Sequence, residues 1–86
     1  MHTVELMDSL CTLAEHLGYT LRQEWLGGAG GGACEFGGRR YIFIDLALSI
    51  LEQQEQVAAA LRDDPALHTV NLAPAVRKAL GLRRVA

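Results

Sequence analysis

A glycine-rich loop is the segment of this sequence with the clearest potential for chemistry. Five of the six residues from 27 to 32 are glycine, and Gly28, Gly30 and Ala33 fit a loose G-x-G-x-x-A pattern. The bare backbone amides of such a loop can approach a phosphate or another anion. A phosphate-binding loop, however, follows a strand and opens a helix, whereas this loop leads into a second extended run. The sequence therefore favours a tight connection between two antiparallel strands. The candidate ligand-binding glycines are Gly28, Gly30, Gly31 and Gly32.

Cys34 and Asp45 complete the set of candidate ligand-binding residues. A thiol beside backbone amides can act as a nucleophile when a base activates it, but nothing in the sequence brings any of the three histidines towards Cys34. Cys34 shares strand parity with Phe36, and free cysteine is usually a small buried hydrophobe, so we expect its side chain to point inward. Asp45 ends an apolar run, where a carboxylate can hold a metal or a ligand hydroxyl or cap a turn. We favour the turn.

The N-terminal segment of the chain has the apolar periodicity of a helix. The apolar stripe is formed by Leu6, Leu10, Leu13 and Leu17, at spacings of four, three and four. This spacing predicts an amphipathic helix, which Thr3 can cap and Gly18 can end. Cys11 lies on the same stripe and is expected in the core.

Three strands are expected after this helix. Apolar and polar residues alternate from Tyr19 to Trp25, as in a strand with one buried face. Residues 33–36 and 39–45 predict two more strands, joined by Gly37-Gly38, because primed hairpin turns need positive φ. Residues 41–44 are all apolar, which favours a central position for the third strand.

The second half of the chain is expected to contain two helices and a short strand. Ser49 and Glu52 form a capping box that should open a helix ending near Arg62. The apolar face of that helix is expected to carry Leu51, Val57, Ala58 and Leu61. Residues 68–72 alternate as in a fourth strand, which could complete a right-handed βαβ crossover with the third strand and this helix. Pro74 and Gly81 bound a last helix.

These elements predict an α+β fold of order α-β-β-β-α-β-α. The sheet is expected to be small and mostly antiparallel, with three to four strands packed by helices. The 86 residues suffice for one domain, residues 1–86, and not for two.

Composition excludes several classes of function. The net charge is −2 and the basic residues form no stripe, so we expect no nucleic-acid partner. No apolar run approaches the ~18 residues of a membrane span, and no basic segment precedes an apolar one at the N-terminus, so we expect a cytoplasmic protein with no membrane partner. The two cysteines form no CxxC pair, which argues against a zinc site or a disulfide scaffold. We expect no cofactor.

The apolar content favours self-association. Half of the residues are hydrophobic, which is high for a chain with so much surface relative to its volume. A homodimer, or a complex with another protein, would cover a spare apolar face. The candidate interface residues are Trp25, Gln53 and Gln56, because aromatic anchors and hydrogen-bonding glutamines suit such a surface.

The segment from residue 38 to 64 carries a basic pair, an apolar strand, a serine-capped helix and a glutamine-rich first turn. In this it resembles a stretch of the ImmA/IrrE-type zinc metallopeptidases. The helix of that family contains His-Glu-x-x-His, which supplies two zinc ligands and a general base. Residues 57–62 here read Val-Ala-Ala-Ala-Leu-Arg, without histidine. The resemblance therefore implies a non-catalytic relative, to which no zinc ligand carries over.

Two functions follow from these observations. The first is a non-catalytic interaction or self-associating module, and it is preferred because no catalytic set is visible. The alternative is a small ligand-binding domain or thiol enzyme that uses residues 27–32 with Cys34 and Asp45.

Overall fold

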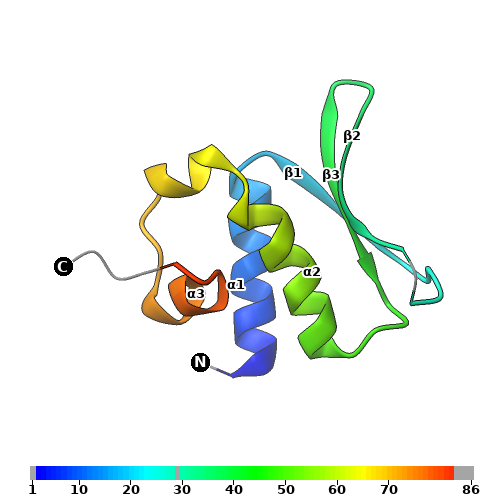
Figure 1. Ribbon diagram of the computed structural model, residues 1–86, viewed down its shortest axis with the longest axis horizontal. Coiled ribbons are helices and arrows are strands. Elements are labelled where there is room, and N and C mark those ends of the chain that lie inside the picture. The colour runs from blue at the N-terminus through cyan, green and yellow to red at the C-terminus, as the bar shows by residue number, and fades with distance from the viewer. Residues whose placement is uncertain (1, 29, 83–86) are drawn as a thin grey trace.

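The computed structural model describes residues 2–28 and 30–82, and it confirms the α+β class. The elements in chain order are helix α1 (Thr3–His16), strands β1 (Tyr19–Glu24), β2 (Gly32–Phe36) and β3 (Arg39–Asp45), helix α2 (Ile50–Arg62), a 3-10 helix η1 (Pro65–Thr69) and helix α3 (Pro74–Ala79). The β2–β3 hairpin projects beyond the helices at the upper right of Figure 1.

The sheet is mixed and has three strands in the order β1-β3-β2. β3 lies in the centre, as its apolar run predicts, parallel to β1 and antiparallel to β2. The tight turn between β2 and β3 is formed by Gly37 and Gly38, with φ values of 59° and 77°, which matches the positive φ of a primed hairpin turn. The parallel β1–β3 pair arises because the chain leaves β1 at one edge and returns through β2 at the other.

The expected fourth strand does not form in the described part of the chain. Residues Pro65–Thr69 form the 3-10 helix η1, and residues 70–73 belong to no helix or strand. The cause is local: Pro65 occupies the first helical turn, and the Asp64 carboxylate accepts a hydrogen bond from the Ala66 amide at 2.9 Å. These two features start a helical turn, so the predicted βαβ crossover is wrong.

Helix ends follow the sequence signals with one exception. Ser49 and Glu52 form the predicted capping box, with N–H to oxygen distances of 3.2 and 3.1 Å. Gly18 follows α1 with a φ of 95°, as expected of a residue that ends a helix. The exception is Thr3, which lies inside α1; His2 is the N-cap residue and makes no side-chain capping bond. The predicted threonine cap is therefore wrong.

The core lies between α1, α2 and one face of the sheet, and η1 and α3 add buried side chains to it. Its fully buried side chains include Leu10, Ile42, Ile44, Val57, Leu61, Leu67 and Leu80. Leu51, predicted to be on the apolar face of α2, is 64% exposed instead. The first turn of α2 extends past the packed region, and the next buried position on that face is Gln54, whose amide donates to the Thr3 carbonyl at 2.7 Å.

Candidate functional site

The Asp45 carboxylate holds the glycine-rich loop in place. Asp45 ends β3 and is completely buried. Its Oδ1 accepts the backbone N–H groups of Leu26 at 3.0 Å and Ala47 at 2.9 Å, and its Oδ2 accepts that of Gly28 at 2.7 Å. Burial alone would raise the pKa of this carboxyl, but the backbone donors outweigh it and lower the pKa below its ordinary value. The carboxylate is therefore ionised and caps two turns at once.

Gln56 of α2 fastens the same loop from the other side. Its Oε1 accepts the Asp45 amide N–H at 2.9 Å, and its Nε2 donates to the Gly30 carbonyl at 2.9 Å. Gln53 donates to the Leu48 carbonyl at 3.0 Å, within the turn before the helix. Both glutamines thus have intramolecular partners, and their role in an interface stays a prediction.

The anion that the loop amides approach is a side chain of the same protein. Gly28, a candidate for binding an external anion, donates its N–H to Asp45. The Gly30 carbonyl accepts a hydrogen bond from the Gln56 side chain. Gly31 and Gly32 have φ values of 109° and 106°, so they form the sharp entry into β2. Ala29 lies outside the described residues.

Cys34 lies apart from this arrangement. Its side chain is exposed, and its Sγ lies 3.9 Å from the Glu35 carbonyl. Cys34 pairs with Tyr41 in the sheet register, four residues along β3 from Asp45, which corresponds to about 13 Å. The structure therefore does not bring the thiol and the carboxylate together. The predicted inward orientation is also wrong, because Cys34 and Phe36 are exposed and share a sheet face that no helix of the described residues covers.

A second polar cluster joins β1, β3 and the end of α2. The Asp64 carboxylate accepts the Tyr19 hydroxyl at 3.0 Å and a guanidinium N–H of Arg40. That guanidinium also lies 4.0 Å from the centre of the Tyr19 ring and donates to the Leu17 carbonyl at 3.3 Å. The hydrogen bond from Arg40 is the main cause that lowers the pKa of Asp64. This cluster borders an open groove of about 570 Å³ between β2 and α2.

Sequence reasoning missed the partners in both clusters. In the sequence, Gln56 appears as a candidate interface residue on a helix, Arg40 as half of a basic pair, and Asp64 as part of a helix end. Each partner lies between 11 and 45 residues from the group it contacts, so no local spacing reveals these bonds. The only local signal is that Asp64 precedes a proline at the start of a helical turn.

Replacing Asp64 with asparagine is expected to reduce stability at neutral pH by about 1–2 kcal/mol, because a charged acceptor of three hydrogen bonds is lost and Arg40 is partly solvent-screened. The folded-state pKa of Asp64 is lowered, so its contribution is present above the ordinary aspartate pKa and disappears as the pH falls through the folded value. The stability gap between wild type and Asp64→Asn should therefore narrow below about pH 4. Urea unfolding between pH 7 and pH 3 measures this gap. Asp63→Asn, an exposed neighbour with the same change in charge, is the control; an equal gap at every pH would contradict the assignment.

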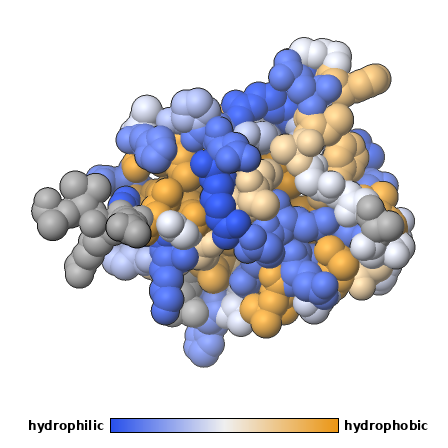
Figure 2. All heavy atoms as spheres, in the orientation of Figure 1, coloured by the Kyte–Doolittle hydropathy of each residue, from blue (hydrophilic) through white to orange (hydrophobic). Residues whose placement is uncertain are grey.

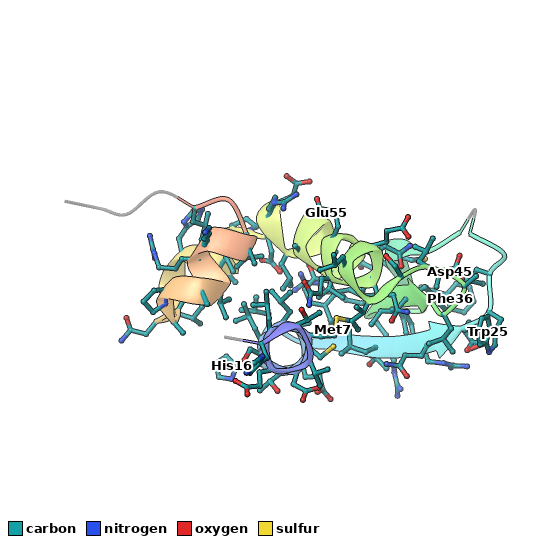
Figure 3. The ribbon with its side chains drawn as sticks, turned by 90° about the horizontal axis from the view of Figure 1, so that it is seen from below. Met7, His16, Trp25, Phe36, Asp45 and Glu55 are labelled. Carbon is teal, nitrogen blue, oxygen red and sulfur yellow. The ribbon has the colours of Figure 1, made fainter. Side chains whose placement is uncertain are left out.

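One face of the sheet is open to solvent, and we call it the open face. Residues alternate across the sheet: Ile42 and Ile44 are buried towards α2, whereas the intervening residues face away. By register, the open face carries Thr20, Arg22 and Glu24 of β1, Arg39, Tyr41 and Phe43 of β3, and Gly32, Cys34 and Phe36 of β2. In Figure 3, α2 lies above β1 and no helix is drawn beneath β1.

The open face is divided into a polar and an apolar half. On β1, Arg22 and Glu24 form an ion pair at 3.3 Å. On β3, the rings of Tyr41 and Phe43 stack with centroids 5.9 Å apart, and Phe36 on the neighbouring β2 is 76% exposed. Arg39, the partner of Phe36 across the hairpin, is the one charged residue among the described residues of this half. The space-filling view shows apolar atoms reaching the end of the projecting hairpin (Figure 2). The apolar half therefore borders the free edge of β2.

Among residues 2–28 and 30–82, no group of three or more histidine, cysteine, aspartate or glutamate side chains could hold a metal ion. Within the same residues, no helix has the length and apolar character to cross a bilayer.

No protein-family model matches this sequence, and no curated protein and no solved structure is significantly similar to it. The resemblance of residues 38–64 to the ImmA/IrrE-type metallopeptidases therefore stays a prediction.

Proposed function

We propose that this chain is a non-catalytic self-associating module, and that the apolar half of its open face is the contact surface. The observation that carries the proposal is the exposure of Phe36 beside the stacked pair of Tyr41 and Phe43. Aromatic side chains are enriched at the centres of protein interfaces, and a stacked pair loses little freedom on binding because its rings are already ordered.

The division of the face supports this function. Interfaces place apolar side chains at the centre and polar ones at the rim. On the open face, Thr20, Arg22 and Glu24 form a polar border along one side of the aromatic stripe, and Arg39 lies beside Phe36 at the hairpin end. Trp25 follows β1 directly and is 76% exposed, so it remains a proposed contact residue at the border of the surface.

The distance between the candidate catalytic groups favours the module over the enzyme. A thiol nucleophile needs a base within hydrogen-bond reach, and the Sγ of Cys34 lies beside the backbone carbonyl of Glu35, which cannot act as that base. Asp45, the other candidate, already accepts three backbone N–H groups. Its lone pairs are largely occupied in holding the loop.

Phe36→Lys is expected to prevent self-association without unfolding the chain. Phe36 is 76% exposed, so it contributes little to the core, whereas a lysine would replace an apolar contact with a charge inside the contact surface. Sedimentation velocity over a concentration series measures the effect: wild type should approach twice the chain mass of 9.3 kDa at high micromolar concentration, and Phe36→Lys should stay at 9.3 kDa.

Leu51→Lys is the matched control. Leu51 is 64% exposed but lies on α2, away from the open face, so this variant should associate as the wild type does. A wild type that remains at the mass of one chain at the highest concentration would contradict self-association. If only Leu51→Lys lost association, the contact surface would lie on the helices and not on the open face.

A further inference from the structure

We infer that two copies of this chain join through the free edges of their β2 strands to form one continuous six-stranded sheet. This inference rests on the proposed self-association and specifies its geometry. In the described residues, the sheet ends at β2 on one side, and an edge strand presents backbone N–H and C=O groups that can pair with another strand. The same edge on a second copy is a suitable partner for it, because two-fold symmetry is the commonest arrangement of dimers.

The hairpin register identifies the free backbone groups of β2. Phe36 and Arg39 flank a two-residue turn, and residues in that position exchange hydrogen bonds with each other. Hydrogen-bonded and non-hydrogen-bonded pairs alternate along an antiparallel ladder. Cys34 and Gly32 therefore also bond inward to β3, and the N–H and C=O groups of Ala33 and Glu35 point outward to the free edge.

One antiparallel register uses all of these outward groups. It places Ala33 opposite Glu35 of the second copy and, by symmetry, Glu35 opposite Ala33, which gives four backbone hydrogen bonds. The two Cys34 residues then face each other at the two-fold axis as a non-hydrogen-bonded pair. A shift that sets Glu35 opposite Glu35 would bring like charges together, which is unfavourable.

The side chains on the open face fit the same register. Phe36 lies opposite Gly32 of the second copy, which has no side chain, so the exposed ring has room to lie across the second strand. Gly32 pairs with Phe43 in its own chain, so the Phe36 ring would reach towards the Phe43 ring of the second copy. An aromatic side chain over a strand glycine is a known way to stabilise a register.

The polarity of the open face favours a second copy over an unrelated partner. Pairing through β2 joins the two apolar halves at the centre of the six-stranded sheet and leaves the polar β1 strands at its two outer edges. The apolar side chains of the two copies then contact each other across the new strand pair, and the charged side chains of β1 keep their access to water. A chain joined through β1 would instead bring the two polar halves together.

Disulfide cross-linking tests this geometry. In the proposed register the Cα atoms of the two Cys34 residues lie about 4.5 Å apart, within the range that a disulfide spans. The protein with Cys11→Ala, which leaves Cys34 as its single thiol, is incubated with oxidised glutathione. Two thiols lose two electrons and two protons to form the S–S bond, and the glutathione disulfide is reduced to two thiols. Non-reducing electrophoresis measures the cross-linked fraction, and sedimentation velocity on the reduced protein measures association in parallel.

A second variant separates edge pairing from stacking of two open faces. It carries Cys11→Ala, Cys34→Ala and Thr20→Cys, so that the single thiol is exposed on β1 of the same face. In the six-stranded sheet the two β1 strands are five strand spacings apart, about 24 Å, and this thiol cannot cross-link within the dimer. We expect dimer cross-linking through Cys34 to be at least tenfold faster than cross-linking through the thiol that Thr20→Cys introduces.

The outcomes distinguish the two proposals. Association with rapid cross-linking through Cys34 and slow cross-linking through Thr20→Cys supports edge pairing. Association with equal rates, or with faster cross-linking through Thr20→Cys, overturns edge pairing and leaves self-association intact. A mass of one chain at all concentrations overturns both.

Discussion

Asp45→Asn is expected to lower the melting temperature by about 10 °C or more, which is a large effect for a single isosteric change. The asparagine keeps one oxygen but replaces the other with an NH₂ group. That group would face the N–H of Gly28, which now donates to Oδ2 at 2.7 Å, or, after rotation, those of Leu26 and Ala47 on Oδ1. Two donors would then face each other in a fully buried site, where an unmade hydrogen bond is costly.

The amides that lose protection in Asp45→Asn should identify the hydrogen bonds that the substitution breaks. Thermal unfolding by circular dichroism gives the melting temperature, and hydrogen exchange measured by NMR gives the protection of single amides. We expect Leu26 and Gly28 to lose protection first, because their N–H groups bond to the replaced carboxylate. Asp63→Asn, which makes the same change in charge at an exposed position, controls for net charge. Equal melting temperatures in the two variants would show that the carboxylate does not hold the loop.

Gly31→Ala is the second substitution with a large expected effect, about 4 kcal/mol from backbone strain and overpacking together. Gly31 has a φ of 109°, which side-chain-bearing residues rarely adopt. A Cβ at this position would also lie 2.9 Å from the Phe43 carbonyl oxygen and would collide with the Gln56 amide. The backbone oxygen cannot move without disturbing β3, and displacing Gln56 breaks its bonds to Asp45 and Gly30.

Gly32→Ala is the matched control for Gly31→Ala. Gly32 has nearly the same φ, 106°, but a Cβ there meets no atom within 4 Å. Both variants suffer the backbone strain, and only Gly31→Ala suffers the collision, so it should be less stable than Gly32→Ala by about 2 kcal/mol. Urea unfolding compares the two midpoints at constant slope. Equal midpoints would mean that the loop is free to move away from Phe43 and Gln56.

These two predictions bear on the proposed interface as well as on stability. Asp45 and Gln56 fix the loop that leads into β2, and Gly31 and Gly32 form the entry to that strand. The loop therefore sets where the free edge begins. A chain with a detached loop would keep the turn at Gly37-Gly38 but would lose the fixed starting point of β2 that edge pairing requires.

Local rules allowed the sequence to predict most of the elements. The capping box at Ser49, the glycine that follows α1 and the two-glycine hairpin turn all depend on residues within a few positions of one another, and the structure contains each of them. The central position of β3 was also predicted from its apolar run, although only Ile42 and Ile44 are buried and Tyr41 and Phe43 lie on the open face. The fourth strand was predicted wrongly because alternation over five residues competes poorly with a capped proline turn.

The candidate site depended on contacts that only the folded chain creates. Alternation in β2 correctly put Cys34 and Phe36 on one face, but parity defines two faces without saying which one a helix covers. That choice is made by the packing of α2 against Ile42 and Ile44, so the pair expected to be buried is exposed. The partners of Asp45 are likewise distant in sequence, at Leu26, Gly28 and Gln56. The sequence by itself determined where helices and turns begin and end, since those signals act over a few residues. The tertiary structure alone decided which carboxylate is enclosed and which sheet face is open, because both depend on how distant segments pack.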